Sequence, residues 1–270
     1  MMKSQDRHLS FCSDKSWVAV LILLVTFWSG CDLPWEPGPM PTELIETEFE
    51  KGLNVFGLLR EDGISGSSFI RVERAIEVDE FNDTMSADIR SADVTIIHDE
   101  SSATYTFQFE EDTTRGNLFF NPYFIPAEGE TYTLTVKAES FPTIFASATI
   151  PQRPGIENPS FSEKSYNFDL VMTEDTGMYE VYLFLKGGSA VYEKVINDGQ
   201  QKKKLSLKIP DGYGSPYLLN IYGYDPQLTE YTNAAVTLRW NTYQETVTTV
   251  EGGYGTFGAV SVSSYWLPIN

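Results

Sequence analysis

The sequence predicts an all-β protein with two β-sandwich-like domains and one short helix in the second domain. Three observations predict this class. From Leu53 onward, apolar residues recur at every second position in short runs separated by Gly, Asn, Asp and Pro. The chain has 270 residues, 41% hydrophobic and 14% aromatic, which is enough apolar material for two modest cores. Pro151, Pro154 and Pro159 cannot join a central ladder, so they indicate a connector between two sets of runs.

The amino terminus predicts a signal peptide over residues 1–30 and a lipid on Cys31. A polar segment with three basic residues precedes an uncharged apolar run over residues 17–28. A membrane-spanning helix needs about 20 apolar residues, whereas a signal-peptide core needs about 7–15. Ser29 and Gly30 directly precede Cys31, as in the bacterial lipobox, where diacylglycerol alkylates the thiol and the chain is cut before it. An ordinary secretory signal and a short uncleaved anchor are the alternatives.

A Pro-rich tether is predicted over residues 31–48. Its prolines favour extended polyproline II and forbid helix. At about 3.1 Å per residue, a dozen such residues hold the folded part roughly 35 Å from the bilayer. We expect the folded part to divide near residue 152 into an N-terminal β-sandwich over 49–152 and a C-terminal, mostly β domain over 153–270.

In the first domain, rows of alternating apolar residues predict strands with one solvated face. In chain order they are Ile70/Val72/Ile76/Val78, Val94/Ile96, Tyr105/Phe107/Phe109, Tyr132/Leu134/Val136 and Ile144/Ala146/Ala148/Ile150. Arg74 stands in the first of these rows. A guanidinium in an apolar row must be paired, or the strand must bulge there.

In the second domain the alternation resumes. The rows are Tyr166/Phe168/Leu170/Met172, Tyr179/Val181/Leu183/Leu185, Val191/Val195, Leu205/Leu207/Ile209 and Tyr217/Leu219/Ile221. Gly187-Gly188 has the length and chemistry of a primed two-residue hairpin turn. Asp198-Gly199 and Asp211-Gly212 mark two further turns.

One segment predicts a helix rather than a strand. Asp225 offers an N-cap, and Pro226 suits the first helical position. Apolar residues between Leu228 and Leu238 then share one face. We expect this helix over Pro226–Trp240, packed on the second domain.

Near the carboxyl end, glycines alternate with Tyr254 and Phe257 over Gly252–Gly258. No Lys follows and no strand-to-helix turn is indicated, so the string is not a phosphate loop. We expect its glycines to permit bulges or close backbone approach, with the two rings covering bare backbone.

The order of several short strings is informative. They are Leu53–Leu59, Phe69–Ala75, Ala92–Ile96, Gly129–Val136, Ala148–Pro151 and Gly252–Ala259. This order resembles the Bacteroidota outer-membrane lipoproteins grouped as domain of unknown function 4249. The resemblance implies an immunoglobulin- or transthyretin-like first domain and a second, mostly β domain. It also implies a TonB-dependent outer-membrane transporter as a partner, and it supplies no catalytic residues.

The charge balance excludes some functions. Lys and Arg number 19 against 38 Asp and Glu, giving a net charge of −19, and such a surface repels nucleic acid. Only two Cys and two His occur, which removes the side chains used by zinc sites and most nucleophile–base pairs. We therefore expect no cofactor, no metal site and no enzyme activity.

Carboxylates are the remaining source of chemistry. They cluster at Glu77/Asp79/Glu80/Asp83, Glu110/Glu111/Asp112 and Glu174/Asp175. A glycan hydrolase uses two carboxyl groups about 5–9.5 Å apart, but each cluster ends an alternating run, where solvated turns are expected. Calcium binding with Asn82 stays open, although no twelve-residue calcium loop is present.

Two other polar features are assigned to the surface. His98 ends a strand beside Asp99 without a Ser or Cys motif, so we expect a surface imidazole rather than a base. Lys202–Lys204 form a basic run, which protection of a strand edge explains as well as binding does.

The best candidate for binding is a set of four rings. Tyr182 and Phe184 lie on the face opposite Val181 and Leu183, and Tyr222 and Tyr224 lie opposite Ile221. They suit a stacking platform for sugars or a hydrophobic seat for a partner. The alternative is a strand buried on both faces beneath the helix.

These features favour a lipid-anchored outer-membrane protein that acts without catalysis, as an accessory or ligand-binding module beside a transporter. A structural or adhesive surface module is the second hypothesis. A carboxylate-based glycan hydrolase is the third. The ligand, the leaflet and the oligomeric state are not indicated by the residues.

Overall fold

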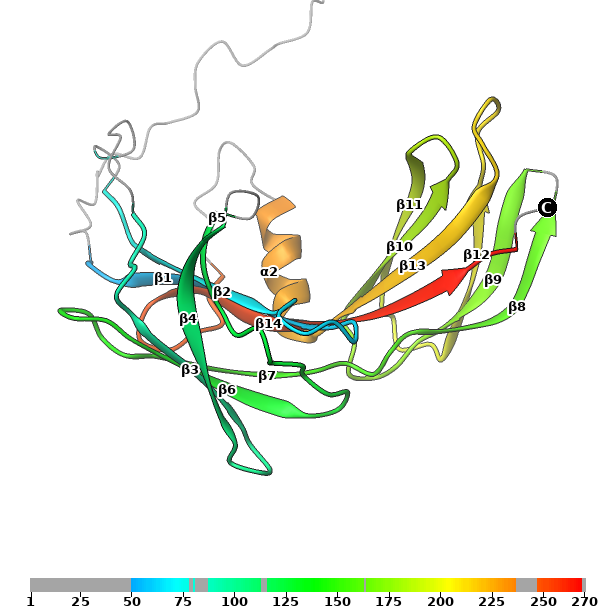
Figure 1. Cartoon of the computed structure of the whole chain (residues 1–270). Helices are drawn as coiled ribbons and strands as arrows, with labels where there is room; N and C mark the ends of the chain where they lie inside the picture. The colour runs from blue at the N-terminus through cyan, green and yellow to red at the C-terminus, as the bar shows by residue number, and fades with distance from the viewer. Residues whose placement is uncertain are drawn as a thin grey trace, which may run out of the picture. The chain divides into compact units, whose positions relative to one another are not determined.

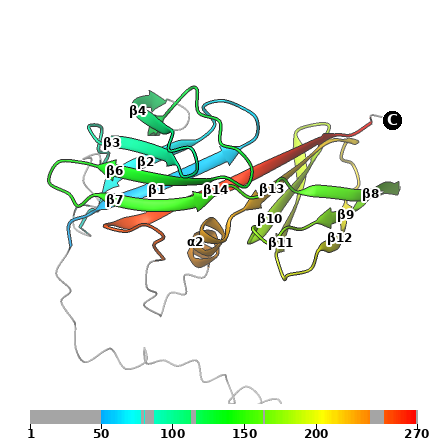
Figure 2. The same cartoon turned by 90° about the horizontal axis from the view of Figure 1, so that it is seen from below.

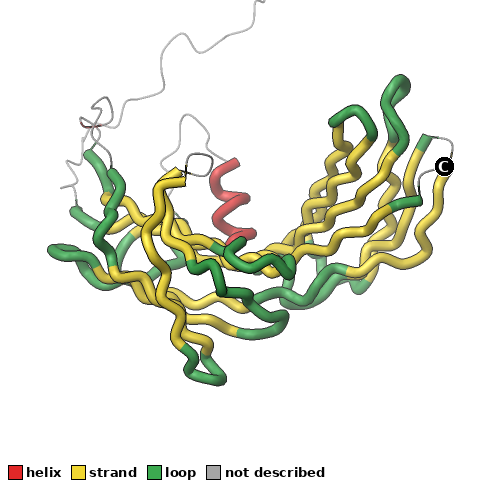
Figure 3. Tube along the Cα trace, viewed as in Figure 1, coloured by secondary structure: helices red, strands yellow, loops and turns green. Residues whose placement is uncertain are grey.

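A computed structural model of the chain describes residues 50–77, 80, 87–112, 116–162, 164–236 and 247–268 (Figure 1). The strands are β1 (Leu53–Glu61), β2 (Phe69–Arg74), β3 (Asp93–His98), β4 (Thr104–Asp112), β5 (Gly116–Phe120), β6 (Thr131–Lys137), β7 (Ile144–Thr149), β8 (Gly155–Ser162), β9 (Ser165–Val171), β10 (Met178–Leu185), β11 (Ser189–Ile196), β12 (Lys202–Lys208), β13 (Pro216–Tyr224) and β14 (Tyr254–Trp266). The helix is α2 (Pro226–Val236). Figure 3 shows that strands dominate the described chain.

The strands form two sheets. The large sheet has 11 strands in the order β11-β10-β13-β14-β1-β2-β5-β4-β3-β6-β7, and the small sheet has three in the order β12-β9-β8. This all-β, sandwich-like architecture confirms the predicted fold class. The predicted lipid site at Cys31, the signal peptide and the tether lie outside the described residues.

Strand β14, the last strand of the described chain, pairs with both the first strand, β1, and strand β13. Its first half pairs in parallel with β1, from Asn54 opposite Tyr254 to Glu61 opposite Ser261. Its second half pairs antiparallel with β13, from Tyr224 opposite Val260 to Leu218 opposite Trp266. Figure 2 shows β14 running from β1 to β13.

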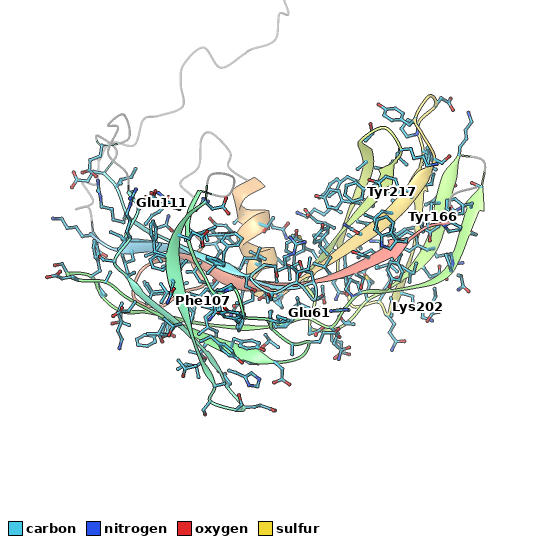
Figure 4. All side chains as sticks on the ribbon, viewed as in Figure 1. Glu61, Phe107, Glu111, Tyr166, Lys202 and Tyr217 are labelled. Carbon is cyan, nitrogen blue, oxygen red and sulfur yellow. The ribbon has the colours of Figure 1, made fainter. Side chains whose placement is uncertain are left out.

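Two hydrophobic cores follow from this arrangement. The first is formed by strands before residue 151 together with Val250, Phe257 and Ala259. The second is formed by residues 166–267, with Tyr166 of β9 inside it (Figure 4). Residues that follow the expected domain boundary at 152 thus contribute to the first core, because β14 crosses between the two.

The predicted connector around Pro151 is held in place. Arg153 forms a salt bridge with Glu61, a buried carboxylate at the end of β1 (Figure 4). The Ser261 hydroxyl donates to the carbonyl of Gln152 at 3.1 Å, and the Tyr265 hydroxyl to that of Pro154 at 3.1 Å. The connector therefore runs along β14.

Close backbone approach explains the glycine-rich string. A Cβ at Gly255, whose φ is +106°, would overlap the carbonyl oxygen of Val55 on β1. The rings of Tyr254 and Phe257 in turn lie over Gly52 and Gly57, which are equally bare. The two rings thus cover glycine backbone, but it is that of Gly52 and Gly57 near β1 and not, as the sequence had predicted, that of the string's own glycines.

Three details differ from the sequence prediction. The strand predicted through Ile76 ends at Arg74, whose guanidinium pairs with Glu80 at 2.6 Å, so the pairing expected of Arg74 is present. Pro159, predicted to belong to a connector, lies within β8. The strand accommodates a proline because β8 is at the edge of the small sheet and its register shifts between Glu157 and Ser160.

The third difference concerns the turn at Gly187-Gly188. Leu185 pairs with Ser189, so the loop has three residues instead of two. Lys186 is the additional residue, since its amide donates to the Ser215 carbonyl at 3.0 Å and continues the ladder toward β13. Both glycines have positive φ, as a tight hairpin requires.

Helix α2 begins as predicted. Asp225 is buried, and its carboxylate accepts from the amides of Leu228 at 2.7 Å and Ala259 at 2.8 Å. One side chain thus caps α2 and attaches it to β14. The helix is described to Val236, and the predicted end at Trp240 lies outside the described residues.

Two glycine substitutions test the close approach of β14. Gly187 and Gly255 have nearly the same φ, +103° and +106°, but only Gly255 faces a neighbouring backbone. Gly187→Ala should cost about 1–2 kcal/mol from backbone strain. Gly255→Ala should cost a further 1–3 kcal/mol or so from overpacking. Urea unfolding measures both, and equal losses would contradict the close approach.

The buried cap makes stability depend on pH. Burial raises the pKa of Asp225 to about 7, although the amides of Leu228 and Ala259 act in the opposite direction. A raised folded-state pKa gives stability that is complete below the unfolded value, near 4, and is lost as the pH rises through about 7. The difference between the free energies of unfolding of the wild type and of Asp225→Asn, wild type minus variant, should therefore fall as the pH rises from about 4 to about 8. A difference that is flat or rises with pH would contradict this account.

Candidate functional site

One face of the large sheet carries the four predicted rings. In the β10–β13 register, Tyr182 faces Asn220, and Glu180 faces Tyr222. Val181 and Leu183 point into the second core, so alternate residues of β10 occupy the other face. The residues of β10 and β13 on that other face, which include the four rings, are half-buried. This face of the sheet is therefore not a further core.

The rings contact one another across three strands. The Tyr182 ring lies 6.3 Å from Phe184, 5.7 Å from Tyr222 and 5.0 Å from Tyr192, measured between centroids. Tyr192 comes from β11 and is 46% exposed. The tyrosine platform is defined as Glu180, Tyr182, Phe184, Tyr192, Tyr222 and Tyr224.

Glu180 is the polar centre of the platform. Its carboxylate accepts hydrogen bonds from the hydroxyls of Tyr224 at 2.8 Å, Tyr192 at 3.0 Å and Tyr182 at 3.3 Å. A half-buried carboxylate needs such partners, because losing water without them is costly. The three phenols therefore satisfy Glu180 and are fixed by it.

This network changes the acidity of the phenols. Burial raises the pKa of Tyr192 to about 12, and the hydrogen bond and negative charge of Glu180 act in the same direction. Burial, with the same two contributions from Glu180, raises the pKa of Tyr224 and Tyr182. All three phenols remain protonated donors at neutral pH.

Cationic side chains border the platform. The Arg60 guanidinium lies 5.8 Å from the centre of the Tyr222 ring and pairs with Asp62 at 2.6 Å. Lys194 faces Glu180 in the β10–β11 register, and its ammonium donates to Asn233 of α2 at 2.7 Å. The face therefore combines flat rings with one carboxylate and two nearby cations.

The sequence prediction named four of the six platform residues. It missed Tyr192 and Glu180. Glu180 could have been found from the sequence, since it is two residues before Tyr182 and therefore lies on the same face of β10. Tyr192 could not, because its position opposite Tyr182 depends on the three-residue loop that sets the hairpin register.

The carboxylate clusters mostly serve structure where they are described. Glu80 pairs with Arg74, Glu111 pairs with Arg90 at 2.5 Å, and Asp175 accepts from the Gln152 amide at 2.8 Å. Asp79, Asn82 and Asp83 lie outside the described residues. Within the described ranges, no group of three or more His, Cys, Asp or Glu side chains is placed to hold a metal.

His98 makes contacts that the sequence did not indicate. Its Nδ1 lies 2.6 Å from the Ser101 hydroxyl, and its Nε2 lies 2.7 Å from Glu130, while Asp99 instead accepts from Thr133. The amides of residues 101–103 bond to Nδ1 of His98, the carbonyl of His98 and the hydroxyl of Ser101. These amides are unavailable to stabilise an oxyanion, so the chain of contacts fits a role in fixing the turn.

Other features lie away from the platform. A cavity of about 320 Å³ is lined by residues that include Phe161, Ile209, Tyr213 and Pro216, around the 209–216 loop. Lys202 of the basic run pairs with Glu157 at 2.7 Å, across the small sheet. In the described part of the chain, no helix is both long and apolar enough to cross a membrane.

Comparison with known proteins identifies a family. The model of a domain of unknown function, DUF4249, matches residues 39–265. No curated protein sequence matches the chain. Among solved structures, the selenomethionine-substituted chicken interferon gamma receptor alpha chain matches at 10% identity, covering 82% of this chain and 99% of that one. Its TM-score is 0.23, a value that does not indicate a shared fold.

Replacing the central carboxylate tests the phenol network. Glu180→Gln removes the negative charge, so the pKa of Tyr192 should fall below about 12, and the pKa values of Tyr182 and Tyr224 should also fall. More phenolate absorbance should then appear at moderately alkaline pH in an ultraviolet titration. Part of the shift should remain, because burial is its largest cause. Glu110→Gln, an exposed carboxylate on β4, is the control and should leave the titration unchanged.

Proposed function

This chain belongs to the DUF4249 family, and from that premise we propose that it is a lipid-anchored, non-catalytic ligand-binding protein of a bacterial outer membrane. We place it in the Bacteroidota on its resemblance to lipoproteins of that group. A TonB-dependent transporter in the same membrane is the proposed partner. The proposed role is to present ligand to that transporter.

The anchor is supported by the sequence around Cys31. The apolar run over residues 17–28 ends at Ser29-Gly30-Cys31, and the only other cysteine is Cys12. Two or three acyl chains on Cys31 give stable attachment, whereas a single chain gives only marginal binding. The Pro-rich residues that follow suit a spacer between the lipid and the sheets.

Ligand binding is supported most directly by the tyrosine platform. Its rings lie on a sheet face instead of in a core, and Glu180 fixes three of them. The same carboxylate is engaged by three donors, which does not suit a general acid or base that must exchange protons with a substrate. A rigid aromatic surface with fixed polar groups suits recognition.

Removing the lipidation site tests the anchor. Cys31→Ala should abolish incorporation of radiolabelled palmitate and release the protein from the membrane fraction. Cys12→Ala is the matched control, and it should retain label and membrane attachment. A wild-type protein without label, or a Cys31→Ala variant that keeps it, would contradict the anchor.

Photo-crosslinking in living cells tests the platform as a contact surface. Ala190 is exposed and faces Phe184 across the β10–β11 pair, so a p-benzoylphenylalanine there samples the platform. We expect an adduct from this position that is lost when Tyr182→Ala and Phe184→Ala are added. The same probe at Tyr123, 88% exposed on a distant loop, is the control. The ligand-binding proposal fails if the Ala190 probe gives no adduct or if the two substitutions leave the adduct unchanged.

A further inference from the structure

The two central rings of the platform lie nearly parallel to each other on β10. Tyr182 and Phe184 are two residues apart on β10, their planes differ by 23°, and their centroids are 6.3 Å apart. Residues at this spacing stand side by side on one face of a strand. The flat apolar faces of aromatic rings match the C–H faces of pyranose rings.

The tyrosine platform is longer than one sugar ring. Glu180 and Phe184 are four positions apart on β10, a span of about 13 Å at the rise of a β-strand. Tyr192 and Tyr222 widen the surface to the neighbouring strands β11 and β13. A surface of this size fits several linked sugar units better than a monosaccharide.

Polar groups alternate with the rings. Asn220 faces Tyr182 in the register, but its Oδ1 atom is buried, without a hydrogen-bond partner among the described residues, and is not offered to a ligand at the surface. The three phenol hydroxyls donate to Glu180, so each oxygen still has lone pairs for a further donor. A docked protein favours a continuous apolar centre, whereas rings interspersed with acceptors fit a polyhydroxylated ligand.

The charges of the chain and of the platform disfavour both anionic and cationic ligands. The whole chain carries a net charge of −19, which disfavours anionic glycans. On the platform the single carboxylate is satisfied by three phenols and lies opposite Lys194, with Arg60 near Tyr222. The surface therefore offers no unpaired charge that would select a cation.

We propose that the tyrosine platform binds a neutral oligosaccharide, with sugar rings stacked on Tyr182 and Phe184 and sugar hydroxyls bonded to the phenol oxygens. This inference rests on the proposed function of the same face in ligand binding. It adds the chemical class of the ligand.

Calorimetry of the full chain in detergent tests the ligand class. The probes are maltohexaose, cellohexaose, xylohexaose and mannohexaose, with hexagalacturonate and a chitosan hexamer as charged comparisons. At least one neutral hexasaccharide should bind, more than about tenfold more tightly than its monosaccharide and than either charged oligomer. The proposal is overturned if no neutral probe binds at about 10 mM, or if a charged probe binds best.

Variants of the two stacking residues test the geometry. Tyr182→Ala and Phe184→Leu should each weaken binding about tenfold or more, because both lose a flat ring. Tyr182→Phe keeps the ring and loses only the hydroxyl, so it should weaken binding less than Tyr182→Ala does, whereas Tyr123→Ala should stay within about threefold of the wild type. Phe184→Leu preserves apolar volume and guards against misfolding. Equal affinities for all variants would overturn the proposal.

The two proposals fail differently. An Ala190 adduct to a protein, with no hexasaccharide bound, would exclude the oligosaccharide and leave the platform as a binding surface. Loss of both the adduct and sugar binding would remove both proposals.

Discussion

Strand β14 can pair with β1 because glycine stands at position 255, where any side chain would overlap the carbonyl oxygen of Val55. The close approach of β14 to β1 places Phe257 in the first core, and the second half of β14 pairs with β13. Through β13 it also positions β10 and β11, the strands of the tyrosine platform. Helix α2 depends on the same strand, since Asp225 accepts from the Ala259 amide.

The platform couples stability to recognition through one carboxylate. Glu180 is half-buried, and hydrogen bonds from three phenols offset the cost of removing its charge from water. The same bonds restrict the rotation of the rings. A ligand that stacks on rings already held in place loses less conformational entropy on binding than one that must order them. The burial that raises the pKa of Tyr192 and Tyr224 keeps both as donors to Glu180.

Local patterns in the sequence predict much of the fold. Period-two alternation identified most strands and assigned Tyr182 and Val181 to opposite faces, because that period is a local property of an extended chain. The cap at Asp225 was also predictable, since a cap and its helix are neighbours in sequence. An edge strand containing Pro159 was not, because edge position depends on the order of strands in the sheet.

The features that the sequence did not indicate depend on pairing between strands that are far apart in the sequence or on their register. The parallel pairing of Asn54 with Tyr254 joins residues near opposite ends of the described chain, and no local pattern specifies that partner. Four ring residues were identifiable by alternation, yet the convergence of Tyr192 and Tyr224 on Glu180 requires the register of three strands. Register follows from loop length and neighbouring strands, so it appears only in the folded chain.

The central claim is that ligand contacts the rings fixed by Glu180. Nuclear magnetic resonance of ¹³C-labelled tyrosine rings, during titration with the hexasaccharide that binds most tightly, tests it most directly. The account predicts saturable shifts for Tyr182 and Tyr192, with unchanged signals from Tyr132 and Tyr166, which belong to the two cores. Shifts confined to other tyrosines, or no shift at saturating ligand, would contradict it.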